Sequence, residues 1–335
     1  MNYASLLNRL LNREDLSHDD MIELMRNIMG GQLTPAQIAA VLIALHMKGE
    51  TVCEIAAAAQ VMRDLSSKVV VQDDRYLIDT CGTGGDGAQT FNISTASALV
   101  AAAAGARVAK HGGRSVSSTC GSADILEMLG VNVNLTPQQV AHHVQELGVG
   151  FMFAPNHHSA LKYAAPVRRE LGVRTLFNLL GPLTNPAGAQ NQVMGVFQRD
   201  LTVKLARVLQ QIGSRHVLVV HGADGMDEIS ISGPTYIAEL KNGTVLEYLV
   251  QPQDFDLQVS SLNSIRVANV DEARTMLLSV LDNQPGAARD IVQLNAGAAI
   301  YVAGLTTTLP AGVKKAKEVI ASGAAKSKLE ALVHI

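Results

Sequence analysis

The sequence has little cysteine and no cysteine pattern that suggests a structural role. Its three cysteines, Cys53, Cys81 and Cys120, are odd in number and form no Cys-x-x-Cys pair. This usage predicts neither a disulfide framework nor a zinc site, and it fits a reducing compartment. The N-terminus also lacks the basic and then apolar regions of a secretory signal. We therefore expect a cytoplasmic protein.

Long apolar runs and an excess of one charge are also missing. The most apolar stretch, Ala96–Ala104, is rich in alanine and shorter than the ~20 residues that a membrane-spanning helix needs. The formal net charge is -3, which predicts no general attraction to nucleic acid or to a membrane surface. Any anion-binding site must therefore be local.

The first 65 or so residues carry only helical patterns. Met21, Leu24 and Ile28 keep the spacing of an apolar helical stripe, and Thr34 and Thr51 each begin a capping pattern. A chain of 335 residues can bury a large core, and one large plus one small domain is the natural expectation. We expect the small one to be an all-helical N-terminal domain.

From Leu77 onward, apolar strands alternate with helices, which is typical of an α/β domain with a central, mainly parallel sheet. Residues 156–186 interrupt this rhythm with two helical patterns and no clear strand. Thr235–Leu249, with Asn242-Gly243 in its middle, predicts a β-hairpin. The expected strands are Leu77–Asp79, Arg107–Lys110, Gly150–Phe153, Val193–Phe197 and His216–His221.

The most informative stretch is the glycine-rich turn within Asp79–Thr95. Its glycines let the backbone bend sharply and bring N–H groups close to an anion. Asn92, Ser94 and Thr95 then open a helix, where free N–H groups and the helix dipole favour negative charge. The turn therefore predicts a phosphate site. Its glycines are Gly82, Gly84, Gly85 and Gly87.

Three of these glycines also fit the G-x-G-x-x-G spacing of a dinucleotide-binding fold. However, the helix is expected to begin only near Ser94, and Asp86 would set a carboxylate against a pyrophosphate. The next strand ends on basic residues, Lys110 and His111, where that fold needs an acid. A dinucleotide-dependent oxidoreductase thus remains an alternative on glycine spacing alone.

A second basic loop follows the next strand. Because loops at the carboxyl ends of parallel strands converge, two phosphate-type loops suggest a ligand with more than one phosphate. Ser122 opens a further helix that could add an anion site, and a plain solvated loop is the alternative reading. The loop consists of Lys110, His111, Gly112, Gly113, Arg114, Ser115, Val116, Ser117 and Ser118.

Two more candidate groups carry charge. Asp227 and Glu228 follow the strand His216–His221, and adjacent carboxylates suit Mg²⁺, which binds phosphates through one or two acids. An exposed acidic turn is the alternative. Arg168, in the helical pattern Ala160–Leu171, offers a bidentate partner for a planar carboxylate, whereas its neighbour Arg169 is expected at the surface.

Taken in order, the motifs GTGGDG, N-x-S-T and KHG-x-R-S-V-S-S resemble those of the anthranilate phosphoribosyltransferase family. The likeness continues through APNHH, PVRRELG, RTLFNLLGPLTNP, VHG and GMDE, and it covers nearly the whole chain. It implies transfer of the phosphoribosyl group from 5-phosphoribosyl 1-diphosphate to the amine of anthranilate, with release of diphosphate, in tryptophan biosynthesis. It also implies a homodimer through the helical domain and Mg²⁺, with two ions per subunit.

The resemblance further implies how the chain is divided. Residues 1–68, joined by about 156–186, would form the helical domain, and 69–155 with 187–335 would form the α/β domain that binds the donor. The fold would be of the nucleoside phosphorylase and phosphoribosyltransferase type, with the substrate sites between the two domains.

The resemblance also implies roles for individual residues, at the positions where this sequence matches the family's motifs. Asp227 and Glu228 match the pair that binds magnesium, and Ser94 matches the serine that touches a second magnesium. Arg168 is assigned to the anthranilate carboxylate, with Gly82, Gly113, His111 and His158 also near the acceptor; taken alone, either histidine is more often structural. The donor-binding set is Gly82, Gly85, Asp86, Thr90, Asn92, Ile93, Ser94, Thr95, Lys110, His111, Gly112, Gly113, Arg114, Ser115, Val116, Ser117, Ser118 and Ser122.

The chain departs from the family pattern in two places. Relatives usually have asparagine after Lys-His-Gly, where this chain has Gly113, and that asparagine contacts anthranilate. Relatives often have Lys-Ser where this chain has Thr119-Cys120. Other open readings are a pyrimidine nucleoside phosphorylase, a phosphoribosyltransferase with a different aromatic acceptor, and a non-catalytic phosphate-sugar binding protein. The last would be expected to have lost Asp227 or Glu228.

Overall fold

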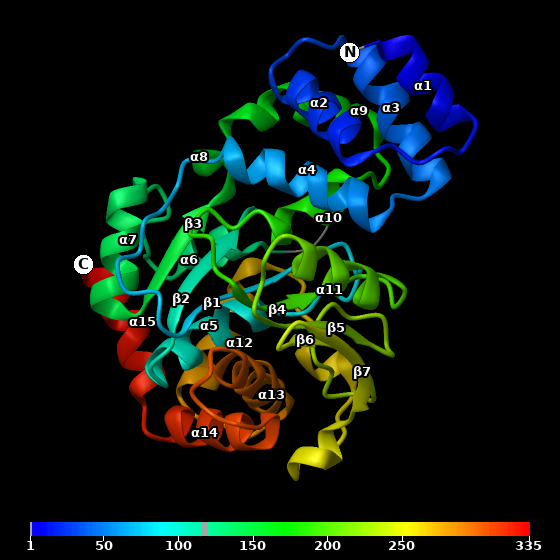
Figure 1. Ribbon diagram of the computed structural model, residues 1–335. Helices are drawn as coiled ribbons and strands as arrows, with labels where there is room; N and C mark the ends of the chain where they lie inside the picture. The colour runs from blue at the N-terminus through cyan, green and yellow to red at the C-terminus, as the bar shows by residue number, and fades with distance from the viewer. Residues whose placement is uncertain (1, 115–119) are drawn as a thin grey trace.

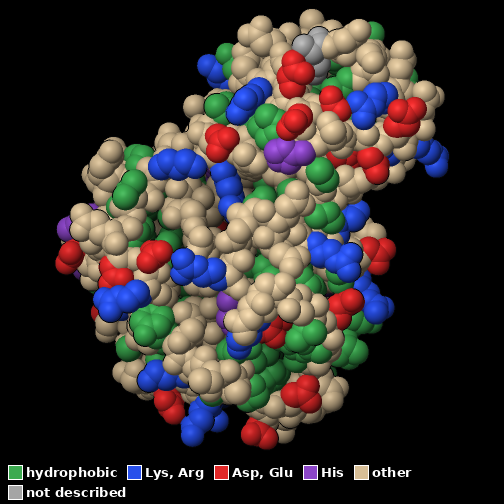
Figure 2. All heavy atoms as spheres, viewed as in Figure 1, with side chains coloured by type: hydrophobic (Ala, Val, Ile, Leu, Met, Phe, Trp, Pro, Cys, Tyr) green, Lys and Arg blue, Asp and Glu red, His purple; other side chains and the backbone are tan. Residues whose placement is uncertain are grey.

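The computed structural model describes residues 2–114 and 120–335 (Figure 1). Ser115, Val116, Ser117 and Ser118 of the second basic loop lie outside the described residues. A helical region at the N-terminal end sits above a larger α/β body, so the expected fold class is confirmed (Figure 1). On the face shown in Figure 2, acidic and basic side chains are interspersed. Among residues 2–114 and 120–335, none of the helices has both the length and the apolar character of a membrane span.

Four helices open the chain, and three of them begin with a reciprocal cap. The predicted boxes at Thr34 and Thr51 are confirmed: each hydroxyl accepts from the N–H three residues on, and that residue's side chain returns to the cap. Ser17 forms a third box. The helices are α1 (Tyr3–Leu11), α2 (His18–Met29), α3 (Pro35–Lys48) and α4 (Val52–Asp64).

A seven-stranded sheet forms the centre of the larger body, in the order β3-β2-β1-β4-β5-β6-β7. The first five strands along the chain are parallel, and β6 and β7 add an antiparallel hairpin at one edge, as the sequence predicts. The strands are β1 (Leu77–Gly82), β2 (Arg107–Gly112), β3 (Val149–Phe153), β4 (Asn191–Gly195), β5 (His216–Gly222), β6 (Thr235–Lys241) and β7 (Thr244–Val250).

Helices cover both faces of this sheet. On one face, the alanine-rich α5 packs with α12 and α13 in a single core that includes Ile78 and Val220. The small side chains of α5 let its backbone approach its neighbours closely. The helices of the larger body, on both faces taken together, are α5 (Ile93–Ala103), α6 (Ser122–Met128), α7 (Pro137–Leu147), α11 (Leu201–Gln211), α12 (Val270–Leu281), α13 (Ala287–Val302), α14 (Leu309–Ala321) and α15 (Ala324–His334).

The segment 156–186 packs with the N-terminal helices rather than with the sheet alone. Val167, Phe177 and Leu180 share one core with Leu24 of α2 and Leu42 of α3, and this core continues to the second face of the sheet. The segment and the N-terminal helices thus share one core. The helices in this part of the chain are α8 (Ala154–His157), which runs into the segment, α9 (Ala165–Leu171) and α10 (Phe177–Leu180). The 3₁₀ turns are η1 (Ser159–Tyr163) and η2 (Gly181–Leu183).

The prediction of one helix is wrong. The pattern Ala160–Leu171 predicts a continuous helix, but the structure has the 3₁₀ turn η1 followed by the separate helix α9. Pro166 lies in the first turn of α9, where its missing N–H costs nothing. In a continuous helix the same proline would break a backbone hydrogen bond and clash with the preceding turn. The break therefore falls where the proline requires it.

Candidate active site

The glycine-rich turn lies at the carboxyl end of β1. Gly84, Gly85 and Gly87 have φ of 64°, 76° and 72°, a region that favours glycine. Helix α5 then begins at Ile93, with Asn92 as its N-cap. The helix thus starts well beyond the third glycine, and the dinucleotide arrangement, in which that glycine opens the helix, does not form.

The loop 223–234, which follows β5, brings Asp227 into this turn. The Gly84 N–H donates to Asp227 Oδ2 at 2.8 Å, and the Asp227 N–H donates to Asp86 Oδ2 at 3.2 Å. The approach is tight on two sides: a Cβ added to Gly82 would lie 2.4 Å from Asp227 Oδ2, and one on Gly195 would lie 1.5 Å from the Asp227 carbonyl oxygen. The predicted meeting of strand ends therefore occurs between β1, β4 and β5.

The half-buried acids at this meeting point repel one another. Desolvation raises the pKa of Asp227 to about 7, and the charge of Asp86 adds to the rise. Desolvation and the neighbouring Asp227 also raise the pKa of Glu228 well above its usual value. Such carboxylates are suited to a divalent cation, which would offset their repulsion.

The acids alone do not complete a metal site. Within residues 2–114 and 120–335, no group of three or more His, Cys, Asp or Glu side chains is arranged to hold an ion. Mg²⁺ commonly takes one or two protein carboxylates and fills its other positions with substrate phosphate oxygens and water. Asp227 and Glu228 fit that smaller requirement.

Lys110 supplies the positive charge beside these acids. Its Nζ is buried and donates to the Thr80 carbonyl at 2.5 Å and to Ser94 Oγ at 3.2 Å. Burial lowers the pKa of Lys110, while nearby acids act in the opposite direction, Asp79 most strongly and Glu228 and Asp227 less. The structure therefore brings Lys110 and Ser94, predicted from separate motifs, into contact at the first turn of α5.

Two predicted histidines also meet. The rings of His111 and His158 lie edge to face, with centroids 5.1 Å apart. Burial lowers the pKa of His111 to about 3 and that of His158 to about 4, so both rings are neutral at physiological pH. The Nε2 atoms of both are buried and have no hydrogen-bond partner among the described residues.

Arg168 and Arg169 have different surroundings. The guanidinium of the half-buried Arg168 lies 5.3 Å from the centre of the Phe177 ring, and burial lowers its pKa. Arg169 is exposed, as expected. A third arginine, Arg174, was not predicted: it donates to the Gly85 carbonyl and lies over the Phe197 ring at 4.0 Å. The helical segment thus contacts the glycine-rich turn.

Some predicted donor residues have other contacts. Arg114 pairs with Asp124 at 3.0 Å and Glu127 at 2.6 Å on α6, so it lies with that helix rather than with Lys110. Asn92 Nδ2 donates to the Cys120 carbonyl at 3.0 Å. Thr90 forms a bridge with Arg266 that ties the turn to a later segment.

The remaining predicted positions are small or buried. A Cβ added to Gly112 would lie 3.2 Å from Ser122 Cβ, so that position is closely packed. The same atom on Gly113 would meet nothing within 4 Å among the described residues. Ile93 and Thr95 are buried in the first turn of α5, and Thr95 Oγ1 has no partner in the part of the chain that the structure describes.

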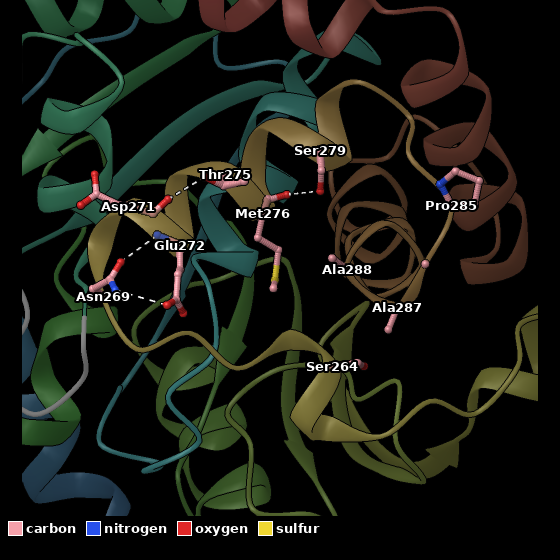
Figure 3. A pocket seen from close by; sticks show the side chains of 11 residues that line it. Ser264, Asn269, Asp271, Glu272, Thr275, Met276, Ser279, Pro285, Ala287 and Ala288 are labelled. Carbon is pink, nitrogen blue, oxygen red and sulfur yellow. Dashed lines mark hydrogen bonds between the residues drawn. The ribbon is translucent and has the colours of Figure 1, made fainter.

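A separate pocket of about 770 Å³ lies between α12, the turn η4 (Leu262–Ile265) and the start of α13 (Figure 3). Figure 3 shows Glu272 and Met276 of α12 facing it, with Ala287 and Ala288 on the opposite side. None of the predicted site residues that the structure describes lines this pocket, so it is distinct from the candidate active site.

Comparison with known proteins agrees with this geometry. Residues 4–66 match the helical bundle domain, and residues 74–326 the a/b domain, of the glycosyl transferase family. An anthranilate phosphoribosyltransferase of Nitrosomonas europaea is 60% identical over 334 residues, covering 100% of this chain and 98% of that protein. One of Thiobacillus denitrificans is 62% identical over 327 residues, covering 98% and 95%.

Solved structures give the same result. The anthranilate phosphoribosyltransferase of Thermus thermophilus matches with a TM-score of 0.93 and 42% identity over 100% of this chain and 99% of that one. The Saccharomyces cerevisiae enzyme in complex with PRPP and Mg matches with a TM-score of 0.89 and 26% identity over 99% and 97%. The chain belongs to the anthranilate phosphoribosyltransferase family.

Proposed function

We propose that this chain transfers the phosphoribosyl group of 5-phosphoribosyl 1-diphosphate to the amine of anthranilate and releases diphosphate. The observation that carries the proposal is the meeting of the glycine-rich turn and the Asp227 loop at one edge of the sheet, with Lys110 in contact with Ser94 at the start of α5. A structure of the yeast relative is a complex with PRPP and Mg, and another is a complex with 4-fluoroanthranilate. Both ligands match the chemistry of this edge.

The donor would lie along the turn and the start of α5. Backbone N–H groups of the turn, with the first N–H groups of α5, can donate to the diphosphate oxygens. Lys110 adds a buried cation that already contacts Ser94. The predicted donor residues Ser115, Val116, Ser117 and Ser118 belong to the same proposal, although they lie outside the described residues.

Asp227 and Glu228 would hold Mg²⁺, with Ser94 beside a second ion. When bound, Mg²⁺ would neutralise charge on the diphosphate leaving group. The role of the chain's own residues is to hold the two carboxylates in place. Gly84 does so through its N–H to Asp227 Oδ2, and Asp86 accepts from the Asp227 N–H.

The acceptor would lie near Arg168, His111 and His158. The Arg168 guanidinium can pair with the anthranilate carboxylate. The two neutral rings offer unpartnered Nε2 atoms, within the described residues, without adding charge next to the nucleophilic amine. The ribosyl carbon would pass through an oxocarbenium-like state, so no protein nucleophile is needed. Catalysis would rest on positioning and electrostatics.

We also propose that the chain is a cytoplasmic homodimer that associates through its helical domain. Ala36, Ala40, Ile43 and Met47 follow one side of α3 at helical spacing, and all are exposed or half-buried. Met47 is 68% exposed. An apolar stripe of this kind on a helix is suited to a matching surface on a second copy.

The test is a direct assay. Purified protein is mixed with anthranilate, 5-phosphoribosyl 1-diphosphate and Mg²⁺, and the loss of anthranilate fluorescence is followed with and without a chelator. A loss of anthranilate fluorescence that requires the donor and stops when the chelator is added supports the proposal. Phosphorolysis of a pyrimidine nucleoside with inorganic phosphate, and no loss of anthranilate, would instead favour the phosphorylase alternative.

A further inference from the structure

We infer that Asn295, in the middle of α13, is a positioning residue for the acidic pair Asp227-Glu228. The inference rests on the proposed function, because it concerns the residues assigned there to Mg²⁺. Asn295 lies outside every motif in the sequence, and its side chain contacts neither the glycine-rich turn nor the basic loop within the described residues. It contacts the chain directly after Glu228.

The contact is a clamp: the Asn295 side-chain amide bonds both backbone groups of one residue, Ile229. Asn295 Oδ1 accepts from the Ile229 N–H at 2.9 Å, and Asn295 Nδ2 donates to the Ile229 carbonyl at 2.9 Å. The same Nδ2 donates to the Ile291 carbonyl at 2.9 Å. Both amide hydrogens and one acceptor position of the oxygen are therefore used, and Asn295 is only 2% exposed. Side-chain amides that pair both backbone groups of one residue fix its orientation as a strand partner would.

This clamp matters because the loop 223–234 has no helix or strand of its own. Asp227 is held at the start of the pair, where its N–H meets Asp86. Asn295 holds Ile229 after the pair. With both flanks fixed, the two carboxylates keep their direction even though desolvation and mutual repulsion oppose their ionised forms.

The helix that carries Asn295 is itself firmly seated. A Cβ added to Gly297, two residues along α13, would lie 2.5 Å from Val313 Cα, and one on Gly312 would lie 2.2 Å from the Gly297 carbonyl oxygen. Helices α13 and α14 thus touch backbone to backbone at this point. The clamp reaches the loop from a rigid element, as a support for metal ligands requires.

The experiment compares Asn295→Ala with Val302→Ala by calorimetry. Val302 is buried at the far end of α13, so its truncation controls for loss of stability in the same helix. Each protein is titrated with inorganic diphosphate at a series of Mg²⁺ concentrations, well below its melting temperature. We expect Asn295→Ala to raise the half-saturating Mg²⁺ concentration about tenfold or more, as loss of a support for metal ligands commonly does. We expect less than about a twofold change for Val302→Ala, which removes no contact to the loop.

A second variant keeps the test decisive if Asn295→Ala does not fold. Asn295→Gln keeps both the donor and the acceptor but displaces them by one methylene, so it should show a smaller shift in the same direction. Equal Mg²⁺ dependence in the Asn295 and Val302 variants would overturn the inference, and so would failure of both Asn295 variants to fold. Because the readout is diphosphate binding, a parent chain that binds Mg²⁺ and diphosphate but does not consume anthranilate would contradict the proposed reaction alone.

Discussion

Asp86 and Asp227 are joined across 141 residues of sequence by a hydrogen bond of 3.2 Å from the Asp227 N–H to Asp86 Oδ2. One acid thereby orients the loop that carries the other, and its charge helps to raise the pKa of Asp227 to about 7. The donor loop and the metal loop are therefore a single electrostatic unit. A change in either loop should alter the behaviour of both.

The double variant Asp227→Asn, Glu228→Gln removes the two proposed metal ligands with little change in shape. We expect the half-saturating Mg²⁺ concentration for turnover to rise by about tenfold or more, because Mg²⁺ prefers charged oxygen ligands. Initial rates over a Mg²⁺ series measure this. Glu330→Gln, which changes an exposed acid on α15, is the matched control. An unchanged titration in the double variant would exclude the pair as ligands.

Mg²⁺ affinity should depend on pH near neutrality. Because the pKa of Asp227 is about 7, the ion must displace a proton below that pH. We expect Mg²⁺ binding in the presence of diphosphate to weaken by roughly tenfold per unit below pH 7 for each proton displaced. Calorimetry in buffers of different ionisation heat would count the protons, and the same titration of Asp227→Asn would give the protons that diphosphate itself releases. Since His111 and His158 are already neutral there, their replacement by Asn should leave this profile in place.

Arg168→Ala should act on one substrate only. The guanidinium is the cation assigned to the anthranilate carboxylate, so we expect the anthranilate KM to rise about tenfold or more and the donor KM to change little. Arg169→Ala, at the exposed neighbouring position, should leave both constants near those of the parent. Comparable increases in both KM values for Arg168→Ala would rule out this role.

Gly113→Asn tests the departure from the family pattern. A side chain there meets no described atom within 4 Å of its Cβ, so the melting temperature should stay within a few degrees. The new amide would lie close in sequence to His111, and we expect the anthranilate KM to fall several-fold while the donor KM is retained. Steady-state kinetics with each substrate varied in turn would decide. An unchanged anthranilate KM would mean that the acceptor lies elsewhere.

Glu239→Gln should lower stability without changing substrate binding. Glu239 on β6 accepts from His216 at 2.8 Å, Tyr301 at 2.7 Å and Tyr248 at 2.9 Å, and these bonds lower its pKa to about 2 despite its burial. Loss of the charge should cost about 1.5–3 kcal/mol at neutral pH. Because the folded pKa lies below the unfolded value, this contribution should disappear in the parent chain as pH falls from above 4 through about 2. Glu247→Gln, exposed on β7, should cost little in chemical denaturation.

Local patterns predict much of this fold. The five parallel strands lie within a few residues of their expected ends, because apolar runs and glycines are local signals. Residues that meet only through folding gave no such signal. Asn295 clamps Ile229 across 66 residues, and Arg174 reaches Gly85 across 89. The meeting of Asp227 with the glycine-rich turn was predictable only because the carboxyl ends of parallel strands share one edge.

The closeness of Gly195 to the Asp227 carbonyl has a consequence for mutational scans of this chain. Gly195 carries no functional group, yet even a methyl group there would occupy the space of that carbonyl oxygen, at 1.5 Å. A substitution would push the acidic pair outward while the strand itself stayed paired. Position 195 should therefore be as intolerant as a ligand position in a growth-selection library, with its defect appearing in metal use rather than in protein abundance.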